Sequence, residues 1–317
     1  MTTQEEYIIK EHLSSPDIDL LNQLREPAED LLNHHLSVSK NWYPHEEVPF
    51  TEARSFNGAN PWEPEDYPLP EGVRSAIFVN LLTEDNLPYY SNTLLNNSLK
   101  NHPIEEWSHQ WTMEEWRHSA VIRDWVLTTR AIDPLELENA RKVQMKLGEV
   151  PIPDSVPDLL AYTSLQELAT QVAHRNTGKH LDKDKMGRRV MALVAGDEGL
   201  HHDFYCGLAT ASFEIDPSTM VIAALSQLKG FKMPGVGIPN FAEHSRAIEK
   251  IGIYDIPQFY DSVVLPTFSK WNIDKLTNLT DEAEIARDKI FRHIQLLGRI
   301  SIRQTNIKDE MSIDSEN

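Results

Sequence analysis

The chain of 317 residues is 40% hydrophobic and 25% charged, with a formal net charge of −19; these values are typical of a folded globular protein and exclude an intrinsically disordered one. The acidic balance argues against a nucleic-acid binder, and the single cysteine excludes an intramolecular disulfide framework. No apolar run approaches the roughly 18 residues that span a bilayer, and because the N-terminus "MTTQEEYIIKEH" lacks a secretory or transit signal, we expect a cytoplasmic protein.

Residues 1–70 are predicted to form an N-terminal arm that packs on the outside of the fold. The part between 40 and 70 is rich in Pro, Trp and Tyr, as in "NWYPHEEVPF" and "NPWEPEDYPLP". Proline lacks a backbone donor and fixes φ, so this composition favours extended chain over helix. The helical part of the chain should therefore begin near residue 71.

After the arm, apolar residues recur at three- and four-residue spacing, which predicts amphipathic helices, and alternating strand patterns are scarce. Four long helices are predicted within 71–213, where proline-punctuated chain links the second helix to the third. Residues 214–303 should add further helices and 304–317 a flexible tail, all in one domain. The predicted helices are 71–100, 104–131, a short one opening at Asp133-Pro134, 158–177, 183–213, 217–229, 240–252, 256–271 and 281–303.

Two of the long helices carry the same pattern, a glutamate followed three residues later by a histidine. Glu115 and His118 lie in "WTMEEWRHSA", and Glu198 and His201 lie in "GDEGLHHDFY". Residues three apart share one helix face, so each pair can reach a common point. A lone pattern of this kind is more often the polar face of an ordinary helix, and only its repetition makes it informative.

Single glutamates on the other two long helices complete the pattern. Glu84 lies 31 positions before Glu115, and Glu167 lies 31 positions before Glu198. Equal intervals bring each pair to the same height in an antiparallel hairpin, with about 13 residues in each arm. The longer interval between Glu115 and Glu167 allows a crossover that leaves the second and third helices parallel. Two hairpins joined by one crossover form the ferritin-like four-helix bundle, so we predict an all-α fold with extra C-terminal helices. Pro88 should kink the first helix near the metal level.

This set of carboxylates and imidazoles suits a pair of iron ions, with manganese as the alternative metal. His202 shares the helix face of Glu198, and we prefer His201 because the other motif uses a three-residue step. Asp197 is either an exposed acid or the acceptor that sets the tautomer of a ligand histidine. The predicted ligands are Glu84, Glu115, His118, Glu167, Glu198 and His201.

The two motifs resemble the Glu-Glu-x-Arg-His and Asp-Glu-x-x-His signatures of the soluble acyl-acyl-carrier-protein desaturases. "LLTEDNLPYY", "YTSLQELATQVAHRNTG" and "PWEPEDY" are also similar to that family, over about residues 40–215, and the bacterial members look closer than the plant ones. The resemblance implies dioxygen-dependent desaturation of a fatty acyl chain on acyl-carrier protein. It also implies a di-iron centre, a ferredoxin-type electron donor and a homodimer.

The resemblance assigns further residues. It implies an electron route through Trp62, Asp197 and His118, and an acyl channel lined by Trp111 and Thr170. Taken alone, Trp111 is more often a core residue than a channel residue.

The basic stretch "GKHLDKDKMGRR" is either a solvated helix end or a local docking patch for an acidic partner. Carrier protein and ferredoxin are both typically acidic, so a chain of charge −19 needs a local basic surface to bind them. We therefore predict that this stretch docks the carrier protein. Its residues are Lys179, Lys183, Lys185, Arg188 and Arg189.

Two other functions use the same ligand set. A di-iron hydroxylase or N-oxygenase of a small metabolite differs from a desaturase only in its substrate channel. A non-enzymatic iron-binding protein is disfavoured, because storage proteins of this fold are short single bundles that assemble into shells.

Overall fold

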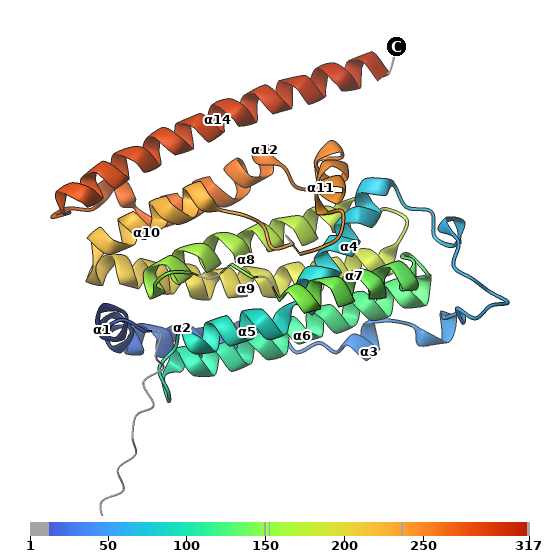
Figure 1. Cartoon of the computed structure of the whole chain (residues 1–317), viewed down its shortest axis with the longest axis horizontal. Helices are drawn as coiled ribbons and strands as arrows, with labels where there is room; N and C mark the ends of the chain where they lie inside the picture. Colours follow the sequence, from blue (N-terminus) through green and yellow to red (C-terminus); the bar gives the residue numbers. More distant parts are fainter. Residues whose placement is uncertain (1–12, 149, 152, 236, 316–317) are drawn as a thin grey trace, which may run out of the picture.

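The computed structural model describes residues 13–148, 150–151, 153–235 and 237–315, and over these ranges every regular element is helical. This confirms the predicted all-α class. Four long helices form the centre of the molecule, and the other elements cover their outer faces (Figure 1). The central helices are α4 (Glu71–Asp85), α6 (Pro103–Thr129), α8 (Val156–Lys179) and α9 (Lys185–Ile215).

The central helices form two hairpins, as the spacing of the glutamates predicts. α8 and α9 pack along most of their length, and α4 packs against α6. The connection from α6 to α8 contains α7 (Pro134–Leu147), which is capped by Asp133 and ends at Gly148 in the left-handed region, φ +61°. This long crossover completes the ferritin-like arrangement.

The predicted helix over 71–100 is broken rather than kinked. α4 ends at Asp85, and α5 (Leu87–Asn96) begins directly after Asn86. Pro88 stands at the start of α5, where its missing N–H costs no helical hydrogen bond. The break lies next to Glu84, in the last turn of α4.

The predicted arm begins with two helices, α1 (Ser15–Gln23) and α2 (Arg25–Val38). α1 opens with a capping box between Ser14 and Asp17. α2 packs on α6 and α9, so this part of the arm contributes to the core. From 39 to 70 the chain is mostly irregular, as predicted, and its short helical turns are α3 (Pro44–Glu47), Phe50–Glu52 and Pro64–Asp66.

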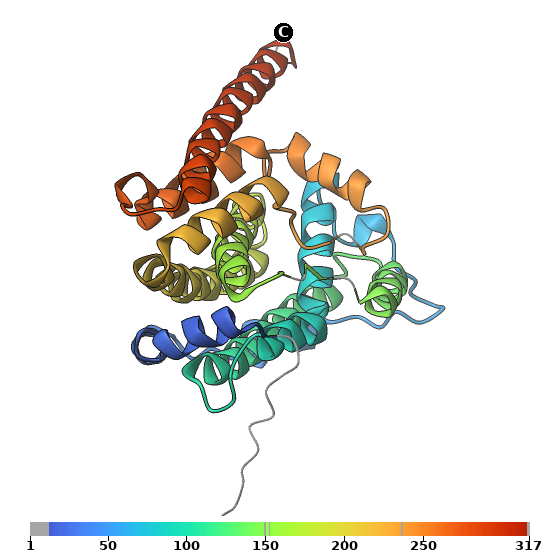
Figure 2. The same cartoon turned by 60° about the vertical axis from the view of Figure 1, so that its left-hand side comes forward.

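The C-terminal third covers one side of the bundle (Figure 2). α10 packs on α8 and α14, and α11 packs on α4. Where we expected a flexible tail, α14 continues as helix to Ser315, because its polar end still contains good helix formers. The elements are α10 (Pro217–Gly230), α11 (Phe241–Lys250), α12 (Ile256–Phe259), a π-helical turn (Tyr260–Val264), α13 (Leu265–Trp271), a short turn (Ile273–Lys275) and α14 (Asp281–Ser315).

None of the helices in the described ranges is long and apolar enough to cross a membrane.

Candidate metal centre

Six buried side chains meet in the middle of the bundle, near the break between α4 and α5. Each Glu-x-x-His pair lies on one face of α6 or α9, and each single glutamate approaches from α4 or α8. Their ligand atoms form two overlapping groups, and within each group all atoms lie within 4.8 Å of one another. The structure therefore brings together all six predicted ligands: Glu84, Glu115, His118, Glu167, Glu198 and His201.

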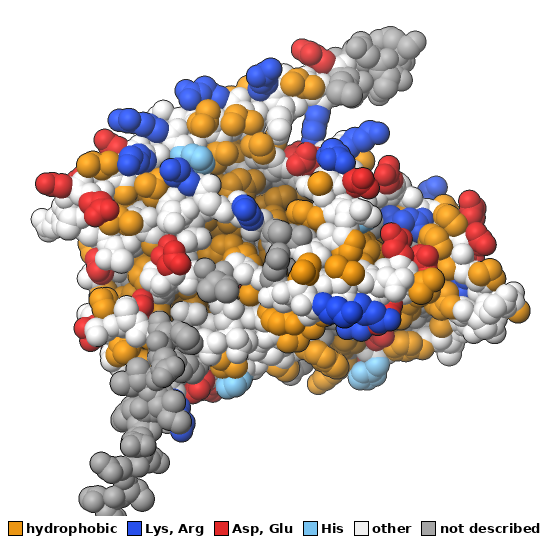
Figure 3. Space-filling model, viewed as in Figure 1, with side chains coloured by type: hydrophobic (Ala, Val, Ile, Leu, Met, Phe, Trp, Pro, Cys, Tyr) orange, Lys and Arg blue, Asp and Glu red, His pale blue; other side chains and the backbone are white. Residues whose placement is uncertain are grey.

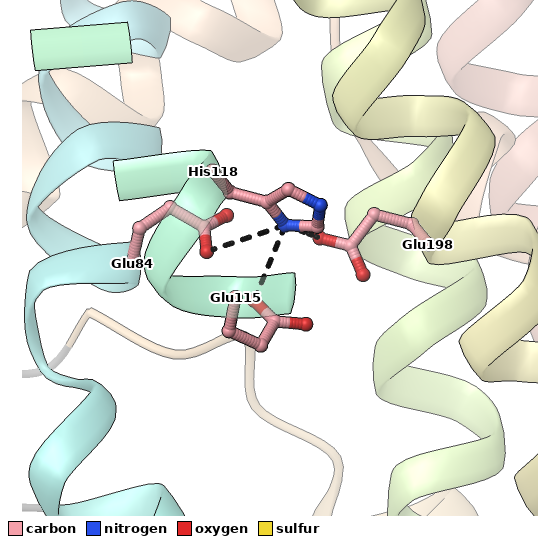
Figure 4. A group of neighbouring side chains, drawn as sticks. All are labelled: Glu84, Glu115, His118 and Glu198. Atoms are coloured by element: carbon pink, nitrogen blue, oxygen red, sulfur yellow. Dashed lines mark ion pairs between the residues drawn. The ribbon is translucent and has the colours of Figure 1, made fainter. Parts of the chain in front are cut away.

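The first group surrounds the imidazole of His118 (Figure 4). Its Nδ1 lies 3.4 Å from an oxygen of Glu115 and 3.8 Å from oxygens of both Glu84 and Glu198. These side chains come from three helices and point toward one another. A cation placed among them would contact α4, α6 and α9 at once.

The second group surrounds His201. Its Nδ1 lies 3.0 Å from Glu115, 3.4 Å from Glu198 and 3.8 Å from Glu167. Glu115 and Glu198 belong to both groups, so each is placed to bridge two cations. His202 points elsewhere, with its Nδ1 2.8 Å from a backbone carbonyl of α8. Of the two histidines that the sequence allowed, His201 is the one that faces the cluster.

The outer nitrogen of each cluster histidine meets a carboxylate from the opposite motif. His118 Nε2 lies 3.2 Å from Asp197 Oδ2, and His201 Nε2 lies 2.8 Å from Glu114 Oε2. Such a bond holds the proton on Nε2 and leaves Nδ1 free to bind a cation. Asp197 was predicted in this position. Glu114 was not, and neither was His35 of α2, whose Nε2 lies 3.1 Å from the same carboxylate.

The two single glutamates also have donors outside the cluster. His174 Nε2 lies 3.1 Å from Glu84 Oε1, and Trp111 Nε1 donates to Glu167 Oε1 at 3.1 Å. Each bond fixes one oxygen of its glutamate and leaves the other to face the cluster. The sequence did not predict His174, because it lies about two turns beyond Glu167 on α8.

The burial of several carboxylates close together makes this cluster favourable for binding cations. Burial, and next the charge of Glu115, raises the pKa of Glu84 well above its usual range. Burial, and next the charge of Glu198, does the same to the pKa of Glu167. Burial alone would raise the pKa of Glu115, but His118 beside it holds that pKa well below its usual range. Burial opposes a charge on His118, yet Glu115 and Asp197 raise its pKa to about 9. Bound cations would supply the positive charge that relieves this repulsion.

Buried polar atoms of the cluster that lack a hydrogen bond indicate whether metal ions would fit there. Among the residues that the structure describes, several buried atoms of the cluster make no hydrogen bond. Each unpaired buried polar atom costs about 1–3 kcal/mol, and metal coordination would satisfy it. Two imidazoles and four carboxylates match the donors that iron and manganese accept. The cluster atoms that make no hydrogen bond are His118 Nδ1, His201 Nδ1, Glu167 Oε2 and Glu198 Oε2.

Of the residues on the predicted electron route, Trp62 lies apart from Asp197 and His118. Trp62 Nε1 donates to the backbone carbonyl of Arg130 at 2.8 Å and does not bond Asp197. Trp42 contacts these residues instead: its Nε1 donates to Asp197 Oδ2 at 3.0 Å, and its ring stacks on His118 with centroids 6.3 Å apart. The arm carries a tryptophan in both "NWYPHEEVPF" and "NPWEPEDYPLP", and local sequence could not show which of them folds back to α9.

Three cavities follow one another past the cluster. The largest, of about 370 Å³, lies between α4, α8, α11 and α12, has mainly apolar walls, and reaches Glu84 and Thr170. The second lies beside the cluster, between Thr170 and Trp111, and the third continues from Trp111 to Tyr162. Both predicted channel residues, Trp111 and Thr170, therefore line this series of cavities.

The predicted docking residues lie around the turn between α8 and α9. Arg189 forms an ion pair with Glu47 of α3, and Lys179 Nζ donates to Asn176 Oδ1 at 2.9 Å. Two aspartates stand between the lysines of this stretch, so its basic charge is partly offset. We call this group the α8–α9 patch: Lys179, Lys183, Lys185, Arg188 and Arg189.

Comparison with known proteins gives three similarities. A family model described as fatty acid desaturase matches residues 16–316. The candidate acyl-[acyl-carrier-protein] desaturase DesA1 of Mycobacterium tuberculosis is 34% identical, over 86% of this chain and 84% of DesA1. The chloroplastic palmitoyl-[acyl-carrier-protein] 4-desaturase 3 of Ophrys sphegodes is 27% identical, over 93% of this chain and 79% of that protein.

Among solved structures, the candidate acyl-ACP desaturase DesA2 of Mycobacterium tuberculosis has the same fold, with a TM-score of 0.68 at 20% identity. The match covers 82% of this chain and 97% of DesA2. The higher identity to the bacterial DesA1 than to the chloroplastic protein agrees with the similarity expected from the motifs.

Proposed function

This chain belongs to the fatty acid desaturase family, and from that premise we propose that it desaturates a fatty acyl chain carried on acyl-carrier protein. It is an oxidoreductase of the acyl-[acyl-carrier-protein] desaturase type. We propose that the reaction uses two iron ions held by Glu84, Glu115, His118, Glu167, Glu198 and His201.

The observation that carries this proposal is the position of the cavities. A mainly apolar space passes directly beside a cluster of carboxylates and histidines, between Glu84 and Thr170. An alkyl chain lying there would bring two adjacent methylenes next to the cluster and would exclude water from them. A hydrophilic metabolite would gain nothing from such walls.

The protein's own residues bind and orient the substrate. Trp111 and Thr170 narrow the space beside the cluster, and Asp197 and Glu114 hold the two histidines in one tautomer. Two bound irons and dioxygen would supply the oxidant that removes two hydrogens from the chain. Two electrons and two protons from outside would balance the conversion of dioxygen to two waters.

We propose a ferredoxin-type protein as the source of these electrons. The contact from Trp42 through Asp197 to His118 is a continuous series of hydrogen-bonded groups between the arm and the cluster. A homodimer is also part of this proposal, on the family resemblance.

Mass spectrometry of the acyl product tests the function. The iron-loaded protein would be incubated with a panel of acyl-carrier substrates, ferredoxin, its reductase and dioxygen. We expect loss of two hydrogens, and fragmentation would locate the new double bond. A gained oxygen would instead establish a hydroxylase on the same scaffold.

A matched control keeps the result interpretable. Glu115→Ala should abolish both iron binding and product, because Glu115 belongs to both ligand groups. If no substrate of the panel changes while wild-type protein holds two irons, acyl desaturation is excluded for that panel, and the ligand assignment stands on the iron content alone.

A further inference from the structure

One exposed face of α14 carries a regular stripe of basic and aliphatic side chains. The positions follow one another at steps of three or four residues, so they line up along the helix. All seven are exposed, including aliphatic residues that are 43–55% accessible. Figure 3 shows blue and orange side chains together over α14. We call this face the α14 stripe: Ile285, Lys289, Arg292, Leu296, Arg299, Arg303 and Ile307.

The charge of this stripe is opposite to that of the whole chain. Between 289 and 308 there are five Lys or Arg and no Asp or Glu, although the chain has a net charge of −19. Within the described part of the chain, the four basic residues of the stripe form no ion pair or hydrogen bond. The ion pairs made by α14 involve Arg287 and Lys308, which lie outside the stripe. The stripe therefore offers four unpaired cations to a partner.

The C-terminal part of α14 lies beside the open end of the largest cavity, although the stripe itself is on the outward face of the helix. Lys308, which follows Ile307 in sequence but lies on the face of α14 that packs on the bundle, bonds Asp255 and donates to the backbone carbonyl of Glu249 at 2.8 Å. Asp255 and Glu249 line the cavity that reaches Glu84. Glu249 and Lys232 are exposed, whereas Glu84 is buried, so this end of the cavity is its mouth.

We propose that the α14 stripe, rather than the α8–α9 patch, is the surface on which the acyl carrier protein docks, because Glu47 and two neighbouring aspartates partly offset the charge of that patch. This inference rests on the proposed function, because it assumes that a carrier delivers the acyl chain. A small acidic protein would pair its carboxylates with the four free cations, and the aliphatic residues between them would pack against its apolar side chains. Docked there, the carrier would hold its thioester at the mouth beside Lys232, from which the acyl chain extends toward Glu84.

A lipid surface fits the stripe less well. Membrane-binding helices present a broad apolar face with basic residues at its borders. Here basic residues stand between the aliphatic ones on a single line, and the opposite face of α14 packs on α10 and α12.

Isothermal titration of metal-loaded protein with palmitoyl-loaded acyl carrier protein tests the surface without requiring turnover. Reversing three stripe cations, Arg292→Glu, Arg299→Glu and Arg303→Glu, should weaken binding by about tenfold or more. The matched control reverses three exposed cations of the α8–α9 patch, Lys183→Glu, Lys185→Glu and Arg188→Glu. It changes the net charge equally and should alter affinity far less.

The aliphatic residues give a second, independent readout. Leu296→Ser with Ile307→Ser should weaken binding by several-fold at both low and high salt, whereas the effect of the charge reversals should shrink as salt rises. All substituted residues are exposed, so the variants should retain the wild-type circular dichroism spectrum and melting temperature.

Three outcomes would overturn the inference. The first is an unchanged affinity in the α14 charge variant, and the second is a larger loss in the α8–α9 control. The third is an absence of carrier binding while wild-type protein sediments with phosphatidylglycerol vesicles in a stripe-dependent way. Failure of the proposed function is distinguishable, because carrier would then bind at α14 without loss of hydrogens from its acyl chain.

Discussion

At the scale of single residues, Glu114 and Asp197 determine how the two cluster histidines can act. An imidazole binds a cation through Nδ1 only when its proton stays on Nε2, and these two carboxylates accept that proton's hydrogen bond. Glu114 also bonds His35, which ties α2 to the site. α2 therefore supports the cluster through Glu114.

We expect Glu114→Ala to lower iron affinity by roughly 10- to 100-fold, because it leaves His201 Nε2 and His35 Nε2 without an acceptor. Iron retained per chain during titration with a competing chelator measures the change. Glu114→Gln keeps an acceptor oxygen and should recover part of the affinity. Glu106→Gln, at an exposed position of the same helix, should have no effect. Equal iron retention in Glu114→Ala and wild type would contradict the assignment.

The six proposed ligands could be predicted because their spacing repeats along the chain. Glu114 could have been found by the same logic, since it precedes Glu115 as Asp197 precedes Glu198. Trp42 could not, because its bond to Asp197 joins residues 155 positions apart and depends on the path of the arm. Contacts of this kind follow from tertiary folding and leave no periodic signal in the sequence.

At the scale of elements, the start of α6 depends on an uncharged histidine. His102 Nδ1 accepts from the N–H of Ile104, and Nε2 donates to the carbonyl of Leu21 at 2.8 Å. Protonation would remove the acceptor that caps the helix. Burial lowers the pKa of His102 below its ordinary 6.5, in agreement with this arrangement.

The sign of the pH effect follows from that lowered pKa. The stabilisation from neutral His102 is fully present above the unfolded pKa of 6.5 and is lost as pH falls toward the lower folded value. His102→Asn keeps a capping acceptor that does not titrate, so its free energy of unfolding should fall less between pH 7 and pH 5, by about 1 kcal/mol. Urea unfolding at both pH values measures the difference, and parallel losses in the two proteins would refute the role of this cap.

Helix positions were predictable where the apolar period is strong, and less so at their ends. Pro88 correctly marked a disturbance near Glu84, but a broken helix and a kinked one share the same local sequence. α1 and α2 were missed because the Pro- and Trp-rich stretch after them dominated the interpretation of the first 70 residues. The placement of α10–α14 on the bundle depends on packing between distant helices, which no local pattern encodes.

At the scale of the whole molecule, the cluster of carboxylates and histidines joins all four central helices. Without cations, four carboxylates repel one another in a buried space, so metal binding should stabilise the fold. We expect chelation to lower the melting temperature by roughly 5 °C or more. Scanning calorimetry before and after chelation measures this shift, and Glu115→Ala should show none. An unchanged melting temperature after verified iron removal would argue against this stabilisation.

Each Glu-x-x-His motif is preceded by an acid that bonds the histidine of the other motif, so each half of the site depends on the other. Glu114 belongs to the first motif but orients the histidine of the second, and Asp197 does the reverse. A substitution in either acid should therefore show its spectroscopic effect at the ion held by the other half of the chain. If each group holds one ion, the two ions would be made inequivalent by a substitution in the motif opposite the ion to be changed, because each hairpin orients the histidine of the other.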